Sequence, residues 1–432
     1  MTRIILIVCV LGLPALGSAR ADVYALHAEP LRASPKAGAA IVDRVDANQT
    51  LALLSTSDDW VHVRAGIEVE GWLPANLISD QWIKVWKKER KLFLMKGDKV
   101  ERTLRIALGA AKPEGPKVER GDGATPEGRF FIAEPDMKPE AGRYGARSLR
   151  LSYPTAEDGR RGLRDHLIDK AAYLEIVRAV RAGEVPPQKT RLGGSIRIHG
   201  GGGKRDWTLG CIALEDEDVV WLSDRVGKGT RVDVYASAAE EGRLNAPGFV
   251  AGAVLAAAKK QMENPAQYTT AAMKAAAIRF PDGDIPADQA VCSDIIVRAL
   301  RGAGLDLQAL IFEDRTLHPE RYPSKKEVPR PSIDHRRVRN LVPYLQRLAQ
   351  TGGLSDKGEL APGDIVIFDT GIVNGTRFDH IGIVDDQKDP SGQPRAINIW
   401  TVGLKTDSMS LIGKSYPTVV AWFRLGHPLA AW

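Results

Sequence analysis

The chain has 432 residues, of which 44% are hydrophobic and 26% are charged, and its formal net charge is +6. This ordinary globular composition excludes a collagen-like, a fully disordered or a polytopic membrane protein, and the length allows two to four domains. The three cysteines, Cys9, Cys211 and Cys292, are too few for a disulfide scaffold or a cysteine-based structural zinc site. The mild, scattered basicity suits contact with an anionic polymer, but it lacks the clustering of a nucleic-acid footprint.

Residues 1–21 have the pattern of a secretory signal peptide. An arginine precedes an apolar run over 4–16, and a small-x-small sequence follows at 19–21. The run is too short to span a bilayer, although a membrane anchor or a buried helix is the alternative interpretation. Cleavage after residue 21 would remove Cys9 and two arginines, lower the net charge from +6 to +4, and leave a periplasmic protein. No other segment is long and apolar enough to be a membrane span.

Residues 22–80 are expected to form a small β-barrel. Short alternating apolar runs are separated by turn residues at the spacing of an all-β module. The sequences L-R-A-S-P-K (31–36), D-D-W-V-H-V-R (58–64) and G-W-L-P (71–74) resemble bacterial SH3-like modules. The resemblance implies binding to cell-wall peptides. The alternative is a β-domain whose tryptophans serve packing alone.

A second, mainly β unit is expected over 82–236. Its predicted strands are 83–85, 91–94, 104–108, 129–132, 195–199 and 231–235, and its predicted helix is 165–181. A turn-rich segment over 121–128 precedes the fourth of these strands.

The first candidate catalytic pair is His199 and Cys211. The segment 195–214 reads S-I-R-I-H-G-G-G-G-K-R-D-W-T-L-G-C-I-A-L, so a glycine-rich loop joins a strand that ends in histidine to a Gly-Cys pair. A thiol attacks acyl carbons only as the thiolate and therefore needs a base beside it. Glycines let backbone N–H groups turn toward a developing oxyanion. By spacing alone, a buried structural cysteine remains the alternative.

The motifs I-H-G and T-L-G-C-I-A-L, with G-D-G-x-T-P-E-G-R-F (121–130) and S-L-R-L-S-Y-P (148–154), resemble the L,D-transpeptidase (YkuD-like) catalytic domain. The resemblance implies an enzyme without a cofactor that acts on peptidoglycan stem peptides. Leu209 stands where the commonest family motif has a second histidine, and the loop is shorter than usual. Both traits look like the YafK-type subgroup, which includes an enzyme that detaches lipoprotein from peptidoglycan.

The same resemblance assigns the roles within this site. Cys211 would be the acyl-accepting nucleophile and His199 its base, with the Gly200 carbonyl orienting the imidazole. The backbone N–H groups of Gly210 and Cys211 are the candidates for the oxyanion hole.

Residues 237–264 are expected to be a polar linker followed by an alanine-rich helix that begins at 249 and breaks at Pro265. A third, α+β unit is expected over 265–432. Its predicted helices are 293–303 and 340–350, its predicted strands are 364–369, 380–385, 396–401 and 419–424, and a basic, proline-rich loop is expected over 319–331.

The second candidate site consists of Cys292, His380 and Asn398. Cys292 precedes a predicted helix, whose N-terminus lowers a thiol pKa, and the other two lie on successive predicted strands. The order cysteine, histidine, asparagine is that of papain-like hydrolases.

The motifs around these residues are F-P-D-G-D-I-P-A-D-Q-A-V-C-S-D (280–294), S-I-D-H-R-R-V-R-N-L (332–341) and P-G-D-I-V-I-F-D (362–369). They resemble a bacterial domain of unknown function that is allied to NlpC-type papain-like peptidases. The resemblance implies that Cys292 is a nucleophile, His380 its base and Asn398 the orienting polar group. A non-catalytic binding role is the alternative.

His335 lies in a charged run that is typical of a solvated face, so we expect a structural or surface role for it. No motif with metal-ligand spacing is present, and no metal is expected.

The sequence thus predicts an exported, periplasmic enzyme of cell-wall biogenesis with two separate thiol sites. One alternative is a purely hydrolytic enzyme, either an L,D-carboxypeptidase or endopeptidase, or one that releases a wall-linked lipoprotein. Another is a non-catalytic wall-binding protein with a Cys211–Cys292 disulfide. The sequence does not indicate an oligomeric state.

Overall fold

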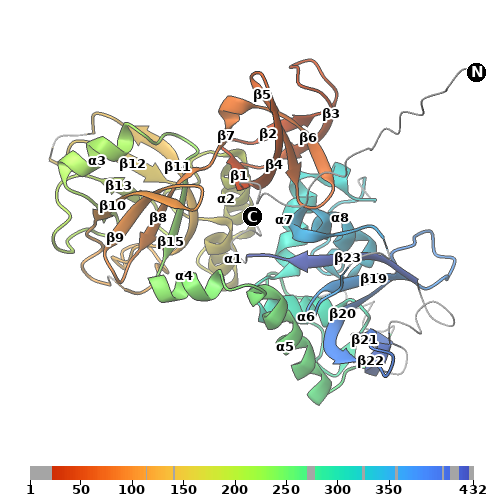
Figure 1. The fold of residues 1–432 in the computed structure, drawn as a ribbon. Helices are drawn as coiled ribbons and strands as arrows, with labels where there is room; N and C mark the ends of the chain where they lie inside the picture. The colour runs from red at the N-terminus through yellow and green to blue at the C-terminus, as the bar shows by residue number, and fades with distance from the viewer. Residues whose placement is uncertain are drawn as a thin grey trace, which may run out of the picture.

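The computed structural model describes residues 22–112, 114–139, 142–269, 278–323, 326–355, 359–400, 403–408 and 418–427. The expected signal peptide and Cys9 lie outside these residues. The chain is multidomain and mostly β, with several helices (Figure 1), and three sheets mark three units along it.

The first unit is a seven-stranded antiparallel sheet in the order β3-β2-β6-β5-β4-β1-β7. Its strands are β1 (Asp22–Ala25), β2 (Glu29–Arg32), β3 (Ile41–Val45), β4 (Thr50–Ser57), β5 (Trp60–Ala65), β6 (Val69–Pro74) and β7 (Ile78–Ser79). Along β5 the exposure alternates strictly, because Val61 and Val63 face a core that Leu31 and Leu73 share. Closure into an SH3-like barrel stays a prediction.

The second unit holds an eight-stranded sheet in the order β10-β9-β8-β15-β11-β12-β13-β14. Its strands are β8 (Gln81–Trp86), β9 (Lys91–Lys96), β10 (Lys99–Arg105), β11 (Gly128–Asp136), β12 (Ser148–Leu151), β13 (Arg197–His199), β14 (Ile212–Ala213) and β15 (Arg231–Tyr235). Two pairs in this sheet are parallel, β15 with β8 and β13 with β14. The second parallel pair forms the first candidate site.

The sequence led us to expect one or two helices in the second unit, one of them over 165–181. Two helices are present, α1 (Ala156–Arg164) and α2 (Lys170–Ala182), and α3 (Asp216–Ser223) follows β14. The boundary between α1 and α2 comes from Asp169, whose carboxylate caps α2 by accepting from the Ala172 N–H. The prediction was therefore wrong over 165–169 and missed α1 and α3.

The third unit follows α4 (Ala238–Leu244) and α5 (Phe249–Glu263). Its helices are α6 (Asp294–Gly302), α7 (Leu307–Leu317) and α8 (Val338–Leu348), with 3-10 turns η3 (Pro319–Arg321) and η4 (Asp334–Arg336). Its main sheet runs β18-β23-β19-β20-β21-β22, and β16 (Gln267–Tyr268) pairs with β17 (Gln289–Ala290). The main strands are β18 (Ala349–Gly353), β19 (Ile365–Asp369), β20 (His380–Lys388), β21 (Pro394–Trp400), β22 (Gly403–Ser408) and β23 (Thr418–Leu425).

Helix α5 belongs to the third unit by its packing. Val250, Val254 and Ala258 from this helix enter the same buried cluster as Leu300 of α6 and Ile383 of β20. The helix that the sequence grouped with the linker therefore contributes to the core of the α+β unit. Residues 270–277, at the expected end of the alanine-rich segment, lie outside the described residues.

Buried charges join the three units. Asp46 of the first unit pairs with Arg181 of the second at 2.9 Å and with His318 of the third at 3.0 Å. Burial alone would raise the pKa of Asp46, but the charge of Arg181 and the hydrogen bond with His318 hold it well below its ordinary value. The fully buried Glu313 of α7 lies 3.2 Å from Arg160 of α1.

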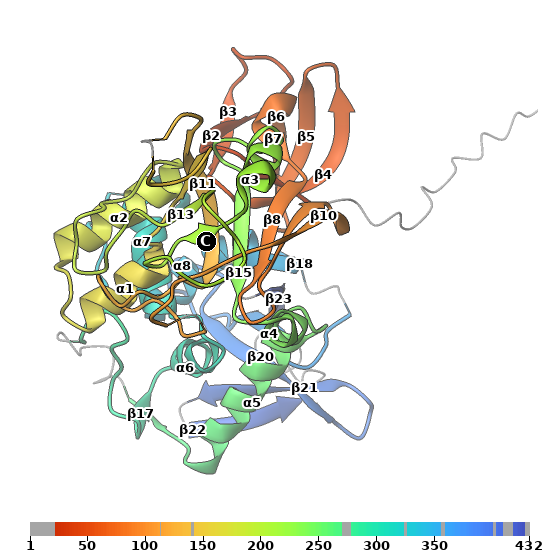
Figure 2. The same cartoon turned by 90° about the vertical axis from the view of Figure 1, so that its left-hand side faces the viewer.

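An apolar cluster lies next to these charges, between the second and third units. Tyr173 and Val177 of α2 pack with Phe312 of α7. Figure 2 shows α1, α2 and α7 together at the left of the view. The Tyr173 hydroxyl also donates to Glu313. Within the described residues, no helix is long and apolar enough to cross a membrane.

Candidate active sites

The parallel pair β13 and β14 brings the first two candidate residues to one place. Ile198 is in register with Ile212, so Cys211 stands opposite Arg197, one position before β14. Residues two apart on a strand point to the same face, which aligns Arg197 with His199. Cys211 and His199 therefore lie diagonally across adjacent strands on one face of the sheet.

The tautomer of His199 is fixed by its own loop. Its Nδ1 lies 2.6 Å from the carbonyl oxygen of Gly200, and a carbonyl can only accept. Nδ1 therefore carries the proton, and Nε2 has the lone pair that a general base needs. This is the orienting role that the resemblance implied for Gly200.

The surroundings keep the His199 imidazole neutral. The side chain is 2% exposed, and the rings of Tyr144 and Trp207 pack edge-on against it at centroid distances of 5.2 and 5.6 Å. Burial lowers the pKa of His199 below its ordinary value, and the Gly200 carbonyl opposes part of that shift. A neutral imidazole is the form that can take a proton from a thiol. Sequence reasoning did not find Tyr144, which reaches the site from a loop far along the chain.

Gly200 has no room for a side chain. A Cβ at this position would lie 2.0 Å from Oδ1 of Asp216, at the start of α3. The same oxygen accepts the N–H groups of Ala146 at 2.8 Å and Gly201 at 3.0 Å. Asp216 thus ties the loop after His199 to the loop that carries Tyr144, and the imidazole is held from both sides.

Cys211 is a free, partly exposed thiol at the end of the glycine-rich loop. Its Sγ lies 3.6 Å from the carbonyl oxygen of Ser195. Burial raises the pKa of Cys211, while the N–H and the charge of Arg197 act in the opposite direction. The resting thiol is therefore protonated at neutral pH, and attack requires proton transfer to a base.

The two candidate oxyanion donors differ. Gly210 has φ of +122°, and a Cβ there would lie 2.6 Å from the carbonyl oxygen of Ala124, so only glycine fits. Its N–H, however, donates to Oγ1 of Thr208 at 3.2 Å. Gly210 would have to leave this partner before it could serve an oxyanion, which makes the Cys211 N–H the stronger candidate.

A cleft of about 530 Å³ opens beside His199. Leu209, the residue in the position of the common second histidine, is 89% exposed and points to solvent. The cleft offers a half-exposed indole and two cations to a ligand, and it is lined by Gly201, Gly202, Lys204, Arg205, Trp207 and Glu215.

The second site lies where the start of α6 meets the start of β20. Cys292 Sγ is 4.0 Å from the carbonyl oxygen of Asp379, the residue before His380. Nε2 of His380 lies 3.4 Å from Oδ1 of Asn398, on the neighbouring strand β21. The amide oxygen accepts, so Nε2 carries the proton and the Nδ1 side of the ring is the side that can act as base. The structure therefore places His380 beside Asn398, and it places Cys292 next to the residue that precedes His380.

The second site is mostly buried from solvent. His380 is buried, and the Trp400 ring meets it edge-on at a centroid distance of 4.2 Å. Burial raises the pKa of Cys292 to about 12, helped by the nearby carboxylates of Asp294 and Asp379. The sequence led us to expect a helix N-terminus that lowers this pKa, and the structure contradicts that expectation because burial and Asp294 outweigh the helix.

A buried clamp holds Cys292 in place. Ser293 Oγ donates to the carbonyl oxygen of Arg336 at 2.6 Å. The Arg336 guanidinium makes two 2.8 Å hydrogen bonds to the carboxylate of Asp294. Both residues directly after Cys292 are thus fixed to η4.

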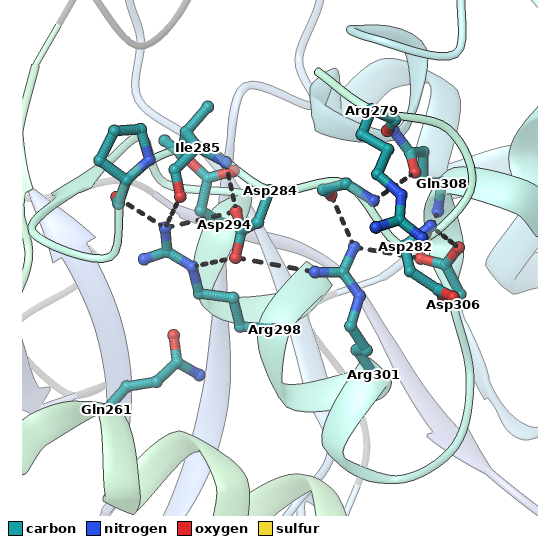
Figure 3. A network of polar contacts seen from close by, with 12 residues as sticks. Gln261, Arg279, Asp282, Asp284, Ile285, Asp294, Arg298, Arg301, Asp306 and Gln308 are labelled. Carbon is teal, nitrogen blue, oxygen red and sulfur yellow. Dashed lines mark hydrogen bonds and ion pairs between the residues drawn. The ribbon is translucent and has the colours of Figure 1, made fainter. Parts of the chain in front are cut away.

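The loop that leads to Cys292 is anchored on the opposite side of α6. Arg301 donates to Asp306 at 3.1 Å and Arg298 donates to Asp284 at 2.9 Å (Figure 3). Arg298 also donates to the carbonyl oxygen of Gln289 at 3.0 Å, so its two contacts join the helix to both ends of the 284–289 segment.

His335 is buried rather than solvated, which corrects the expectation for the charged run around it. The neighbouring Asp334 pairs with the buried Arg315 of α7 at 2.6 Å, which draws the run inward. Burial lowers the pKa of His335 to about 4, so it is neutral. Its role in this structure is a structural one.

Both Cys211 and Cys292 are free thiols. Among the described residues, no group of three histidine, cysteine or carboxylate side chains could hold a metal ion.

The second and third units match two different protein-family models. Residues 80–234 match the model of the L,D-transpeptidase catalytic domain, YkuD. Residues 255–424 match the model of DUF1287, a domain of unknown function. The uncharacterized protein YijF of Escherichia coli is 35% identical over 155 residues, which cover 35% of this chain and 68% of YijF.

Solved structures with low overall similarity include Bd1075 of Bdellovibrio bacteriovorus, which is 20% identical with a TM-score of 0.25. That match covers 37% of this chain and about half, 49%, of Bd1075. L,D-transpeptidase 1 of Mycobacterium tuberculosis is 14% identical with a TM-score of 0.22, over 41% of this chain and 70% of that one. On the strength of the sequence matches, the chain belongs to the family of YijF, and its residues 80–234 are an L,D-transpeptidase (YkuD) catalytic domain.

Proposed function

We propose that this protein is an exported peptidoglycan-modifying enzyme in which Cys211 accepts an acyl group from a wall stem peptide. The observation that carries the proposal is the His199–Gly200 contact of 2.6 Å, which leaves Nε2 as the base on the face that Cys211 shares. The bond attacked is the amide between an L-centre and a D-centre of the stem peptide.

The residues on this face support a two-step acyl transfer. As Sγ of Cys211 attacks the carbonyl carbon, the thiol proton passes to Nε2 of His199. The proton then goes to the leaving amine as its C–N bond breaks, and a thioester remains. An acceptor amine next attacks the thioester, gives its proton to His199, and the thiol leaves and is protonated again. The chemistry needs no cofactor.

Water in place of the acceptor amine would make the enzyme a hydrolase. The exposed Leu209 in place of a second histidine resembles the YafK-type subgroup, which includes an enzyme that detaches lipoprotein from peptidoglycan. Transpeptidation is the reaction we favour, because the domain matches the L,D-transpeptidase model. The outcome with water is distinguished by its products, which lack any new cross-link.

We further propose that the third unit is a papain-like cysteine amidase or peptidase. Cys292 would attack, His380 would take its proton, and Asn398 would orient the imidazole. The specific support is the convergence of the three residues, with His380 3.4 Å from Asn398 and the preceding carbonyl 4.0 Å from the thiol.

The first unit is proposed to be an SH3-like module that holds wall peptides, and residues 1–21 a signal peptide that directs the chain to the periplasm. In this scheme the first unit supplies attachment and the other two supply chemistry. A wall-binding protein without catalysis is the competing function, in which neither thiol would be needed.

Muropeptide analysis tests these functions together. Isolated sacculi are treated with the wild-type chain, with Cys211→Ser and with Cys292→Ser, and the soluble and cross-linked products are separated by chromatography. We expect new 3–3 cross-links or exchanged D-amino acids that depend on Cys211, and cleaved amides that depend on Cys292. Identical profiles for all three proteins would reject both catalytic proposals.

A further inference from the structure

The pocket beside Cys292 is lined on one side by a run of arginines. It has a volume of about 280 Å³ and also contains the rings of Tyr268 and Phe378. The arginines at positions 336, 337 and 339, at the end of η4 and the start of α8, line it. A pocket of this size holds a small ligand group rather than a glycan strand.

The three arginines differ in how far their charge is compensated. The charge of Arg336 is compensated by the carboxylate of Asp294, with which it forms the clamp that fixes Cys292. Arg337 has only longer contacts, 3.5 Å to Glu327 and 4.0 Å to Asp334.

Arg339 has no hydrogen bond or ion pair with any residue in the described part of the chain, although its side chain is half-buried. An uncompensated guanidinium in a partly dry pocket favours an anion, and its planar fork matches a carboxylate.

Among the described residues, neither carboxylate near the pocket forms an ion pair with Arg339. Asp379 lines the same pocket, but its oxygens accept from the Thr370 N–H at 2.9 Å and from Asn374 Nδ2 at 2.9 Å. It also bonds the Thr370 hydroxyl at 2.5 Å. Asp294 is likewise occupied by Arg336.

The nucleophile and the arginine run are parts of one rigid piece. Ser293 and Asp294, directly after Cys292, are bonded to the backbone and side chain of Arg336. Arg337 and Arg339 follow Arg336 in the chain, so the clamp fixes the backbone of the arginine run relative to Cys292. Such fixed spacing is what a site needs if it selects substrates by a charge near the scissile bond.

We propose that the Cys292 site selects acidic peptide amides, and that Arg339, assisted by Arg337, binds a carboxylate of the substrate next to the amide carbonyl that faces Cys292. The inference rests on the proposed function of the third unit for its catalytic part, and its binding part stands by itself. The aromatic rings of Tyr268 and Phe378 would pack on the aliphatic portion of the same residue.

A binding measurement tests the selection without requiring turnover. The full chain with Cys211→Ala and Cys292→Ala is titrated by calorimetry with two stem peptides, one with free carboxylates and one with these carboxylates converted to primary amides. We expect the acid form to bind about 10- to 100-fold more tightly, as for a charge-assisted hydrogen bond. Arg339→Met in the same background should remove that preference, while Arg339→Lys should retain part of it.

A matched control separates direct contact from general electrostatics. Arg377 is exposed, precedes Phe378 and does not line the pocket. Arg377→Met removes the same charge near the site and should leave the acid-to-amide ratio unchanged. Equal binding of the two peptides, no binding of either, or the same loss from Arg377→Met and Arg339→Met would each overturn the inference.

Turnover then distinguishes this inference from the proposed function. Cys211→Ser is assayed on both peptides, and cleavage is followed by mass spectrometry. Carboxylate-selective binding without any Cys292-dependent cleavage would reject the peptidase and keep the anion site. Cleavage of both peptides at the same kcat/KM, unchanged by Arg339→Met, would keep the peptidase and reject the anion site.

Discussion

The ion pair between Asp294 and Arg336 should carry much of the stability of the third unit. Both side chains are almost fully buried, and two 2.8 Å hydrogen bonds join them. The Asp294 carboxylate also accepts the Val291 N–H at 2.7 Å, on the other side of Cys292. Asp294→Asn keeps the shape and one acceptor, but it leaves the guanidinium buried without an anion.

The expected loss follows from that burial. Removing one partner of a buried pair costs about 3–5 kcal/mol, because the remaining charge is desolvated and uncompensated. For a unit of this size, about 2–4 °C is lost per kcal/mol, so the unfolding midpoint should fall by about 6–20 °C. The double variant Asp294→Asn/Arg336→Met removes both charges and should recover most of the loss.

Differential scanning calorimetry on the full chain measures these shifts in the transition of the third unit. The matched control is Asp386→Asn, because Asp386 pairs with Lys259 at 2.5 Å on the surface, where the two side chains are 50% and 39% exposed. Solvent screening makes that ion pair weak, so Asp386→Asn should leave the unfolding midpoint of the third unit unchanged. An unchanged midpoint for Asp294→Asn, or a double variant no better than the single one, would refute the reasoning.

Three further predictions concern the first site and the contact between units. Trp207→Ala should admit water to His199 and raise the pKa of its imidazole, so the acidic limb of the kcat/KM profile should move up toward pH 6.5. Trp207→Phe keeps a ring against His199 and should leave the acidic limb in place. An unshifted acidic limb in the alanine variant would contradict this prediction. Gly210→Ala should lower kcat by about 10²–10³, because the added Cβ would lie 2.6 Å from a carbonyl oxygen. The control is Gly128→Ala, since Gly128 has a similar φ of +119° and no atom near the added Cβ. An equal loss of kcat in the control would remove the steric explanation. Glu313→Gln should destabilise the chain by about 3–5 kcal/mol, because it leaves the buried partners of this carboxylate without an anion. Limited proteolysis between the second and third units should then become faster. Unchanged cleavage rates would show that the buried carboxylate does not join the two units.

In the third unit the sequence predicted helices α6 and α8 and four strands of the main sheet, but it missed helix α7 and strands β16, β17, β18 and β22. The β-branched strands of the third unit were found near their observed positions, including β19 (Ile365–Asp369) and β23 (Thr418–Leu425). Helix α7 (Leu307–Leu317) was missed because it has no exposed polar stripe. Its charged residues 313–315 are buried and pair with other segments, so the amphipathic pattern of a surface helix is absent.

The sites show the same division between local and distant information. Short motifs around Cys211 and Cys292 indicated the candidate nucleophiles. The structure places His199 on the strand adjacent to Cys211, and it places Cys292 next to the residue before His380. Distant contacts were not predictable, because nothing local marks them: Tyr144 against His199, and the buried position of His335, both depend on tertiary packing. The pairing of Gly210 with a threonine hydroxyl likewise became apparent only from the folded loop.

The central claim is that one chain carries two independent thiol sites. The most direct measurement is the muropeptide profile of sacculi treated with the wild-type chain, Cys211→Ser and Cys292→Ser at equal concentrations. The account predicts that each substitution abolishes a different product and leaves the other product at its wild-type level. Loss of both products in either variant, or of neither product in both, would contradict it.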